Sequence, residues 1–241
     1  MRVTILIPAL DEAAALPATI AALNLLDPPA DELLLVDGGS SDATVALAQA
    51  AGLRVVLSPK RGRAVQINYG VEQAQSEVVC VLHADSALPP DGVAVIRATM
   101  ADRTMALASF TPRIAGPGGT RWVTTAHNWI KTWYAPLIMR PHLFVRGVRL
   151  LFGDHAMFFR RADFLAVGGC DPGVAIMEEA DLCIKLARLG HIRMVPRWVW
   201  TSDRRIAAWG PLKANWVFFK IGILWSFGAR ARLGKLYPDV R

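Results

Sequence analysis

Short apolar runs alternate with helix-like segments over the first hundred residues, and this alternation constrains the fold more than any other feature. The apolar runs lie at 3–7, 33–36, 53–57 and 78–82. Helical spacing of Ala, Leu and Val separates them at 12–25, 43–51 and 62–75, and a further helix follows Pro89-Pro90-Asp91 up to Met100. Repeated β-α-β units predict an α/β fold: a doubly wound, mostly parallel sheet with helices on both faces.

The pattern is looser after residue 103. It predicts a strand at 105–110, a Gly/Pro loop at 113–119 and an amphipathic helix at 122–138. A strand at 151–159, interrupted at 153–155, and a helix at 180–189 follow. We expect one domain at 1–205, with halves 1–102 and 103–205, followed by a C-terminal helical appendage at 206–241.

Positive charge is concentrated at the C-terminal end. From Arg188 onward there are 11 Lys or Arg against 2 Asp or Glu, and all eight Trp residues lie after residue 121. No nucleic-acid-binding motif accompanies these charges. The segment from Trp209 to Arg232 fits an amphipathic helix lying on an anionic membrane surface. A helix buried in the core or in a homodimer contact is the alternative.

Three cysteines, at 80, 170 and 183, form no CxxC pair, which favours a reducing compartment. The first residues run directly into an apolar strand that Pro8 ends, unlike a signal peptide. We therefore expect a cytoplasmic protein, either free or peripherally bound at the inner face of the membrane.

Acidic residues follow the first, second and fourth predicted strands. Asp11, Asp37 and Asp85 each stand at or just after a strand end. Because ligands of such sheets bind beyond the carboxyl ends of the strands, these acids point to one binding edge. The GxGxxG of dinucleotide-binding folds and the Walker phosphate loop are both absent, which argues against a dehydrogenase or a P-loop enzyme.

Two short motifs offer chemistry. His83-Ala84-Asp85 ends a buried strand, and its carboxylate could hold Mg²⁺ or Mn²⁺. Glu178-Glu179 stands at a predicted helix start, where the acids could complement the helix dipole. One of them could instead be a general base whose pKa is raised by its like-charged neighbours.

The order IPALDE, VDGGSSD, GRAVQINYG, HAD, GDHAMFFRR, GG, MEEAD and RLG resembles the family 2 glycosyltransferases of the GT-A fold. More narrowly, it resembles a bacterial subgroup of radical-SAM/selenodomain-associated transferases. The resemblance implies a nucleotide-sugar donor, a divalent metal (Mn²⁺ or Mg²⁺) and inverting single displacement. It makes 1–102 the nucleotide-binding half and 103–205 the acceptor-binding half.

The resemblance also implies roles for individual residues. Asp85 takes the place of the metal-binding Asp of the family's DxD motif, and His83 takes the place of its first Asp. Glu179 takes the place of the base, with Glu178 as the alternative. The remaining residues that it places at the donor, the acceptor or a phosphate are Pro8, Ala9, Glu12, Asp37, Arg61, Arg63, Ala84, Asp154, Arg204 and Arg205. The QxxRW motif of processive synthases is missing, which favours a single transfer.

Three functions therefore stay open. The first is a glycosyltransferase, with a UDP-sugar as the expected donor and an unidentified acceptor that is a lipid or is associated with a membrane. The second is a non-catalytic nucleotide-sugar-binding module, because both the DxD and the base motif are altered. The third is a sugar nucleotidyltransferase, although that class needs a Gly-rich loop near residues 8–16, where this chain has Ala and acids.

Overall fold

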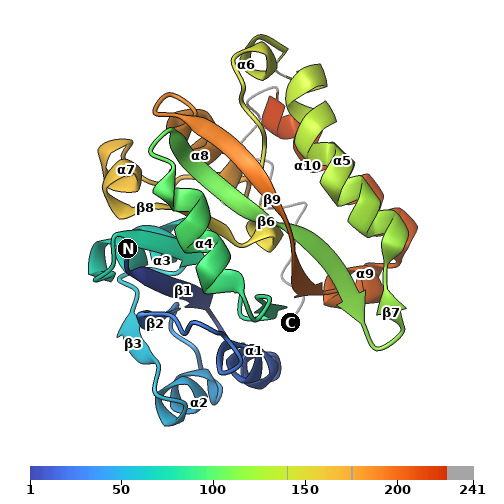
Figure 1. Ribbon diagram of the computed structural model, residues 1–241. Helices are drawn as coiled ribbons and strands as arrows, with labels where there is room; N and C mark the ends of the chain where they lie inside the picture. Colours follow the sequence, from blue (N-terminus) through green and yellow to red (C-terminus); the bar gives the residue numbers. More distant parts are fainter. Residues whose placement is uncertain (140, 175, 227–241) are drawn as a thin grey trace.

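The structure is a computed structural model that describes residues 1–139, 141–174 and 176–226. Within these residues nine strands form one sheet in the order β3-β2-β1-β4-β8-β6-β9-β5, and β7 pairs with β6 (Figure 1). The strands are β1 Val3–Ala9, β2 Glu32–Asp37, β3 Arg54–Leu57, β4 Val78–Val81, β5 Ser86–Ala87, β6 Met105–Gly116, β7 Gly119–Thr120, β8 Met157–Arg160 and β9 His191–Ser202. The helices are α1 Leu16–Leu23, α2 Thr44–Ala50, α3 Arg63–Gln73, α4 Gly92–Ala101, α5 Trp122–Met139, α6 Pro141–Val145, the 3₁₀ turn η1 Gly153–His155, α7 Arg161–Ala166, α8 Glu178–Leu186, α9 Arg204–Trp209 and α10 Pro211–Ser226.

The N-terminal half confirms the predicted β-α-β units. Strand β1 is central and pairs in parallel with β2 on one side and β4 on the other, while β3 extends the sheet beyond β2. The four predicted helices of this half are present as α1 to α4, although α1 begins at Leu16 rather than at Glu12. The carboxyl ends of β1, β2 and β4 therefore meet at one edge, as the sequence predicted.

The second half corrects the prediction of a mostly parallel sheet. Strand β8 runs antiparallel to both β4 and β6, and β5 runs antiparallel to β9, whereas β6 and β9 are parallel. The sheet is therefore mixed. The apolar pattern identifies a buried strand, but the pattern is the same whichever way the strand runs, so it could not reveal the reversal at β8.

Two local predictions in this half were also wrong, and one strand was missed. The segment 113–119 is not a loop, because β6 continues to Gly116 and turns back into β7. The strand predicted at 151–159 is reduced to β8, and η1 precedes it. Strand β9 was not predicted, since Arg193, Pro196 and Arg197 interrupt its apolar residues.

Two apolar clusters lie on opposite faces of the sheet because successive strand residues point to opposite sides. Leu6 of β1 packs with α3 residues such as Ile67, and Val71 joins the same cluster. Ile5 and Ile7 pack on the other face with the cluster that includes Ile96 of α4. These two layers fix α3 and α4 on either side of β1 (Figure 1).

Helix α3 approaches the sheet closely at Gly70. A Cβ atom there would lie 2.5 Å from Cδ1 of Leu6 and 2.6 Å from Cγ2 of Val36. Only a residue without a side chain leaves room for both neighbours. This contact places the first turn of α3, with Arg63, beside the ends of β1 and β2.

The described part of the predicted appendage packs against the rest of the chain. Helix α10 lies beside α5 and α9 (Figure 1). Its residues Ile221 and Trp225 belong to the same cluster as Leu6, and Ala214 packs with Ile114 and Ile206. Residues 227–241, which include the end of the predicted membrane segment Trp209 to Arg232, lie outside the described residues. Domain boundaries at 102 and 205 remain predictions.

Candidate active site

One cavity of about 480 Å³ gathers most of the residues that the sequence singled out. It lies beyond the ends of β1 and β4 and is closed by α5, α8, α9 and α10. The predicted residues that line it are Pro8, Ala9, Glu12, Arg63, His83, Ala84, Asp85, Asp154, Glu178, Glu179, Arg204 and Arg205. These residues come from segments almost 200 positions apart, so the fold brings them together.

Asp37 and Arg61 are not among the residues that line this cavity. The carboxylate of Asp37 accepts hydrogen bonds from the backbone N–H groups of Gly39 and Ser40 and from the Ser40 hydroxyl. Gly39 has φ +91°, a backbone conformation that glycine adopts without strain. The side chain of Asp37 thus holds the glycine turn after β2. Arg61 donates to the carbonyl oxygen of Gly39 at 3.3 Å, on the exposed side of the same turn.

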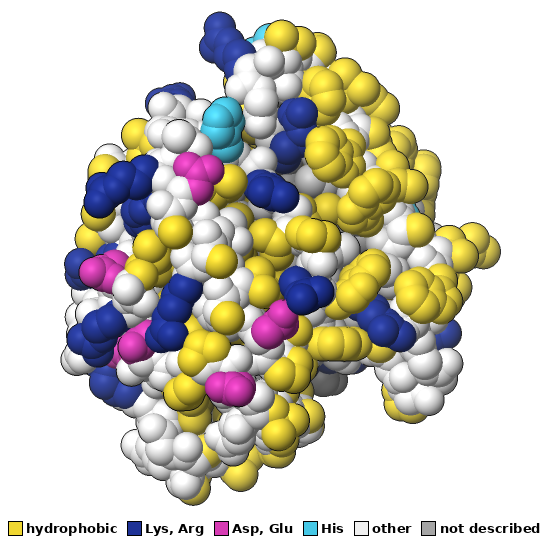
Figure 2. All heavy atoms as spheres, in the orientation of Figure 1, with side chains coloured by type: hydrophobic (Ala, Val, Ile, Leu, Met, Phe, Trp, Pro, Cys, Tyr) yellow, Lys and Arg dark blue, Asp and Glu magenta, His cyan; other side chains and the backbone are white. Residues whose placement is uncertain are grey.

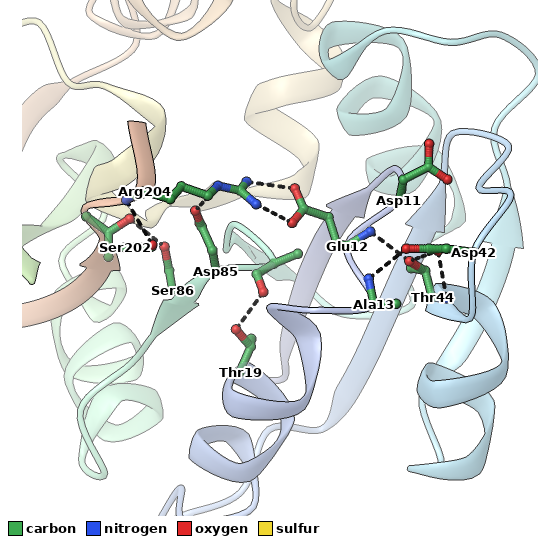
Figure 3. Close-up of polar contacts among 12 residues, drawn as sticks. Asp11, Glu12, Ala13, Thr19, Asp42, Thr44, Asp85, Ser86, Ser202 and Arg204 are labelled. Atoms are coloured by element: carbon green, nitrogen blue, oxygen red, sulfur yellow. Dashed lines mark hydrogen bonds and ion pairs between the residues drawn. The ribbon is translucent and has the colours of Figure 1, made fainter. Parts of the chain in front are cut away.

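A three-residue ion-pair network forms one wall of the cavity (Figure 3). The Nη1 and Nη2 atoms of Arg204 donate to the two oxygens of Glu12 at 2.7 and 2.8 Å. The Nε atom of the same guanidinium lies 3.0 Å from Oδ2 of Asp85. Burial raises the pKa of Asp85, and the charge of Glu12 adds to this, while Arg204 opposes both. Arg204 therefore shares its single positive charge between two carboxylates at this edge of the sheet.

Local hydrogen bonds fix Glu12 in this network. The N–H of Glu12 donates to Oγ1 of Thr44 at 2.8 Å, and the N–H of Ala13 donates to Asp42 at 3.0 Å (Figure 3). Thr44 begins α2, so the first turn of that helix holds the loop that follows β1. Nothing in the sequence indicated this contact between the loop after β1 and the start of α2.

His83 lies in the same wall, two residues before Asp85. Burial lowers its pKa to about 3, and the charge of Arg63 adds to that effect. The imidazole is therefore neutral at physiological pH. Its Nε2 atom lies 3.4 Å from Nη1 of Arg63.

The side chains around Asp85 offer few donor groups for a divalent cation. No three His, Cys, Asp or Glu side chains in the described ranges gather closely enough to hold a metal ion. Asp85 and the neutral His83 nevertheless supply one oxygen and one nitrogen donor, a set that suits Mn²⁺ when other ligands complete it. The site therefore fits a cation shared with a bound ligand rather than a cage made of protein side chains alone.

Two adjacent glutamates at the start of α8 line the same cavity. Glu178 and Glu179 are both buried. Nε of Arg63 lies 3.1 Å from Oε1 of Glu178, and Nη1 lies 3.6 Å from Oε1 of Glu179. Burial and the charge of Glu178 raise the pKa of Glu179 to about 8, although Arg63 opposes the shift. A carboxyl group with such a pKa can take up a proton near neutral pH.

Helix α5 contributes residues that the sequence reasoning missed. His127, Asn128, Lys131 and Tyr134 line the cavity from one side of this helix. The side-chain amide of Asn128 donates to Asp154, and His127 Nε2 lies 2.6 Å from the Tyr134 hydroxyl. Their spacing of three or four residues within a Trp-rich helix was the signal that could have revealed them.

Lys131 of α5 also lines this cavity. Its Nζ lies 3.7 Å from the centre of the Phe152 ring. Burial lowers the pKa of Lys131, whereas the charges of Asp154 and Glu179 raise it. The lining of the cavity thus also includes two glutamates, an aspartate and a lysine.

Comparison with known proteins finds a family model and a relative that match this chain. The family model described as "Glycosyl transferase family 2" matches residues 4–167. An uncharacterized glycosyltransferase of Mycobacterium tuberculosis is 35% identical over 86 residues, which are 36% of this chain and 38% of that protein. The chain thus matches well under half of that relative's length.

Two solved structures share the fold. A mannosyltransferase from Pyrobaculum calidifontis, in complex with GDP-Man and Mn²⁺, superposes on all of this chain and 66% of its own, with 19% identity and a TM-score of 0.70. TarS of S. aureus (residues 1–349), in complex with UDP-GlcNAc, covers 85% of this chain and 59% of its own, with 12% identity and a TM-score of 0.64. At these identities the likeness shows a common fold of the GT-A type.

Proposed function

Because the chain belongs to glycosyl transferase family 2, we propose that it moves a sugar from a nucleotide-sugar donor to an acceptor hydroxyl with inversion at the anomeric carbon. The observation that carries this proposal is a buried Glu179 with a raised pKa in the same cavity as the Arg204 network. Fold neighbours bound to GDP-Man and to UDP-GlcNAc support a nucleotide-sugar donor. We propose a UDP-sugar, and membership of the radical-SAM/selenodomain-associated subgroup is part of the same proposal.

The donor occupies the edge beyond β1 and β4. Pro8, Ala9 and Glu12 line the pocket for the nucleotide, and Asp37 and Arg61 stand at the turn after β2. Gln66 supports this pocket, because its amide donates to the carbonyl oxygens of Ala9 and Val36 at 2.7 and 2.9 Å. The amide therefore holds the ends of β1 and β2 in register below the nucleotide.

Arginine side chains stabilise the leaving nucleoside diphosphate. Negative charge develops on it as the bond between sugar and phosphate breaks, and positioned cations lower the energy of that state. Arg63, Arg204 and Arg205 all line the cavity. Arg204 holds Asp85 and Glu12 in this structure, so it exchanges part of that network for the diphosphate when the donor binds.

Asp85, with His83 beside it, is the group that would hold a divalent cation together with the diphosphate. Such a cation supplies Lewis-acid stabilisation of the leaving group. The Mn²⁺ in the mannosyltransferase complex supports this assignment. Arg204 must release Asp85 for the carboxylate to take a metal.

Glu179 removes the proton of the acceptor hydroxyl as that oxygen attacks the anomeric carbon from the face opposite the diphosphate. The ion pair of Arg63 with Glu178 keeps a cation close to the base and holds the first turn of α8. Asp154, fixed by Asn128, lies on the acceptor side with Lys131. The missing QxxRW motif supports a single transfer, and the apolar helices beside the cavity support an acceptor at a membrane.

Two alternative functions predict different results in the same assays. A non-catalytic module would bind the donor and never cleave it. A sugar nucleotidyltransferase would release pyrophosphate from a nucleoside triphosphate, but residues 8–16 lack the Gly-rich loop that such chemistry uses.

The decisive experiment is a thermal-shift screen against UDP, GDP, ADP and CMP with and without Mn²⁺, followed by hydrolysis of the sugar nucleotide of the best base. A ligand that binds only the folded state raises the melting temperature. Release of the nucleoside diphosphate in wild type, and its loss in Glu179→Gln, supports the proposal. Binding without any turnover, or pyrophosphate release from a triphosphate, overturns it. NMR of the released sugar reports the anomeric configuration.

A further inference from the structure

Helix α5 has two chemically different sides. Its polar side lines the cavity, whereas its other side exposes large apolar residues to solvent. Those residues are Trp122, Val123, Trp129, Ile130, Trp133, Leu137 and Ile138. Neighbouring α10 exposes Leu212, Trp216 and Phe219. Figure 2 shows hydrophobic side chains gathered over the side of the molecule where α5 lies. We call the exposed residues of these two helices the α5–α10 face.

An exposed surface of this kind is unusual on a globular protein. Apolar side chains scattered singly need no explanation, but contiguous patches mark interaction sites. Trp129 and Trp133 have ring centres 6.4 Å apart, and Trp216 stacks with Phe219 at 5.9 Å. The aromatic rings on each helix therefore form groups rather than isolated residues.

Cations accompany the exposed tryptophans. The Arg149 guanidinium lies 5.1 Å from the Trp133 ring, and Lys220 Nζ lies 5.0 Å from the Trp216 ring. Arg113 lies 5.1 Å from Trp122 in the same way. In each pair a positive charge lies beside an exposed aromatic ring. This combination suits the headgroup layer of a membrane.

The helices that carry the α5–α10 face contain no acidic residue. The sequence has no Asp or Glu from 121 to 153 or from 204 to 226, and these ranges contain all of α5, α6, α9 and α10. Lys213, Lys220 and Arg146 are exposed there. The α5–α10 face is thus apolar and exclusively cationic, and its complement is an apolar layer edged by negative charge.

We propose that the α5–α10 face binds the surface of a bilayer that contains anionic lipids. The tryptophans enter the headgroup layer, and the lysines meet lipid phosphates, each worth about a fivefold gain in partitioning. A second copy of the chain fits this face less well, because a twofold contact would bring the same cations of both copies together. Among the described residues no helix has the length and hydropathy that crossing a bilayer requires.

The inference extends the earlier membrane prediction from α10 to α5, and it stands without the proposed enzymatic activity. If the proposed function holds, α5 separates the bilayer from the cavity. Its polar residues Asn128 and Lys131 then receive the headgroup of an acceptor that stays in the membrane.

Co-sedimentation of the full chain with vesicles tests the proposal. We expect binding to phosphatidylglycerol-containing vesicles, much weaker binding to phosphatidylcholine alone, and release at high salt because exposed charges are screened. Lys213→Gln/Lys220→Gln should lower the partition coefficient on anionic vesicles about 30-fold. Leu137→Ser/Ile138→Ser should lower it at least about tenfold.

A matched control separates this face from general hydrophobicity. Leu189 and Leu25 are 49% and 69% exposed, close to the 49% and 71% of Leu137 and Ile138, but they lie at the end of α8 and after α1. Leu25→Ser/Leu189→Ser should bind vesicles as wild type does. The proposal fails if wild type ignores anionic vesicles, or if the control pair weakens binding as much as the α5 pair. It also fails if wild type is a dimer that Leu137→Ser/Ile138→Ser converts to a monomer while vesicle binding is absent. Sugar-nucleotide hydrolysis in detergent-free buffer reports separately on the proposed function.

Discussion

The Nε atom of Arg204 lies 3.0 Å from Oδ2 of Asp85, so the carboxylate expected to hold a cation is held by an arginine. The same guanidinium also bonds both oxygens of Glu12 (Figure 3). One side chain thus joins the loop after β1, the end of β4 and the start of α9. Arg204 thus supplies positive charge beside the two carboxylates at this edge of the sheet.

Replacing Arg204 should therefore change metal binding as well as donor binding. In Arg204→Gln, Asp85 and Glu12 lose their counter-ion, and we expect Mn²⁺ to bind the ligand-free protein more tightly than it binds wild type. Sugar-nucleotide hydrolysis should fall by about 10²-fold or more because a cation at the leaving group is lost. Isothermal titration calorimetry with Mn²⁺ and a turnover assay measure the two effects.

Arg204→Lys is the matched control for charge. A lysine keeps the positive charge but cannot bond three oxygens in one plane, so we expect intermediate hydrolysis. If Arg204→Gln binds Mn²⁺ no better than wild type, the competition between Arg204 and a cation for Asp85 is disproved.

Asp85 itself should be required for the metal. We expect Asp85→Asn to lose the enhancement of UDP binding by Mn²⁺, whereas His83→Asp keeps it, because Asp85 supplies the anionic oxygen and His83 only assists. Thermal shift with UDP, with and without Mn²⁺, measures this. Mn²⁺-enhanced binding and turnover in Asp85→Asn would show that the metal lies elsewhere.

Activity should depend on the protonation of Glu179. Its pKa is raised to about 8, and a base works only as the carboxylate, so kcat/KM should rise with pH and reach half its maximum near pH 8. Glu179→Gln should lower turnover by at least about 10²-fold while donor affinity is kept. Glu178→Gln should have the smaller effect on turnover, and the reverse ranking would make Glu178 the base.

The same shift predicts a stability change with a definite sign. A glutamate in the unfolded chain has a pKa of about 4.3. Between that pH and about pH 8 the folded state therefore binds the Glu179 proton more tightly than the unfolded state does. The contribution of this group to stability therefore falls as pH rises through that window. The melting temperature of Glu179→Gln relative to wild type should increase over the window, and a constant difference would contradict the raised pKa.

The sequence predicted the part of the site that depends on strand ends and motifs. Asp37 and Asp85 were placed at one edge because parallel strands bring their carboxyl ends together, and Glu12 was placed there by the family resemblance. The polar side of α5 was missed, since Asn128 and Lys131 belong to no motif and the exposed tryptophans dominate that helix. The bond between Arg204 and Asp85 joins positions 119 residues apart in the chain, a contact that no local pattern encodes.

The fold was likewise predictable from the sequence in one part and not in another. The first four strands and helices were predictable because each strand is a continuous apolar run between turn residues. The reversal at β8 was not, because Phe158 and Phe159 are buried on opposite faces whichever direction the strand takes. Strand β9 owes its place to pairing with β6 rather than to its own composition.

Gly70 provides a test of the packing between α3 and the sheet. In Gly70→Ala, the new methyl group must displace Leu6 or Val36, and we expect a loss of about 1–3 kcal/mol in the free energy of unfolding. Gly118→Ala is the control, because no atom lies within 4 Å of a Cβ there, and its change should stay within about 0.5 kcal/mol. Urea denaturation measures both, and equal stabilities would disprove the close contact.

Lys131 should tune the base from the acceptor side of the cavity. Glu179 and Asp154 raise the pKa of Lys131, and by reciprocity the ammonium favours the carboxylate form of Glu179. In Lys131→Met the rise of sugar-nucleotide hydrolysis with pH should therefore move to higher pH, while thermal shift with the donor is unchanged. Lys131→Arg keeps the charge and should therefore show the wild-type pH profile. If the lysine acted only by packing its stem on Phe152, the profile would not depend on the charge at this position. If the pH profile of Lys131→Met matches that of wild type, the lysine does not act on the base.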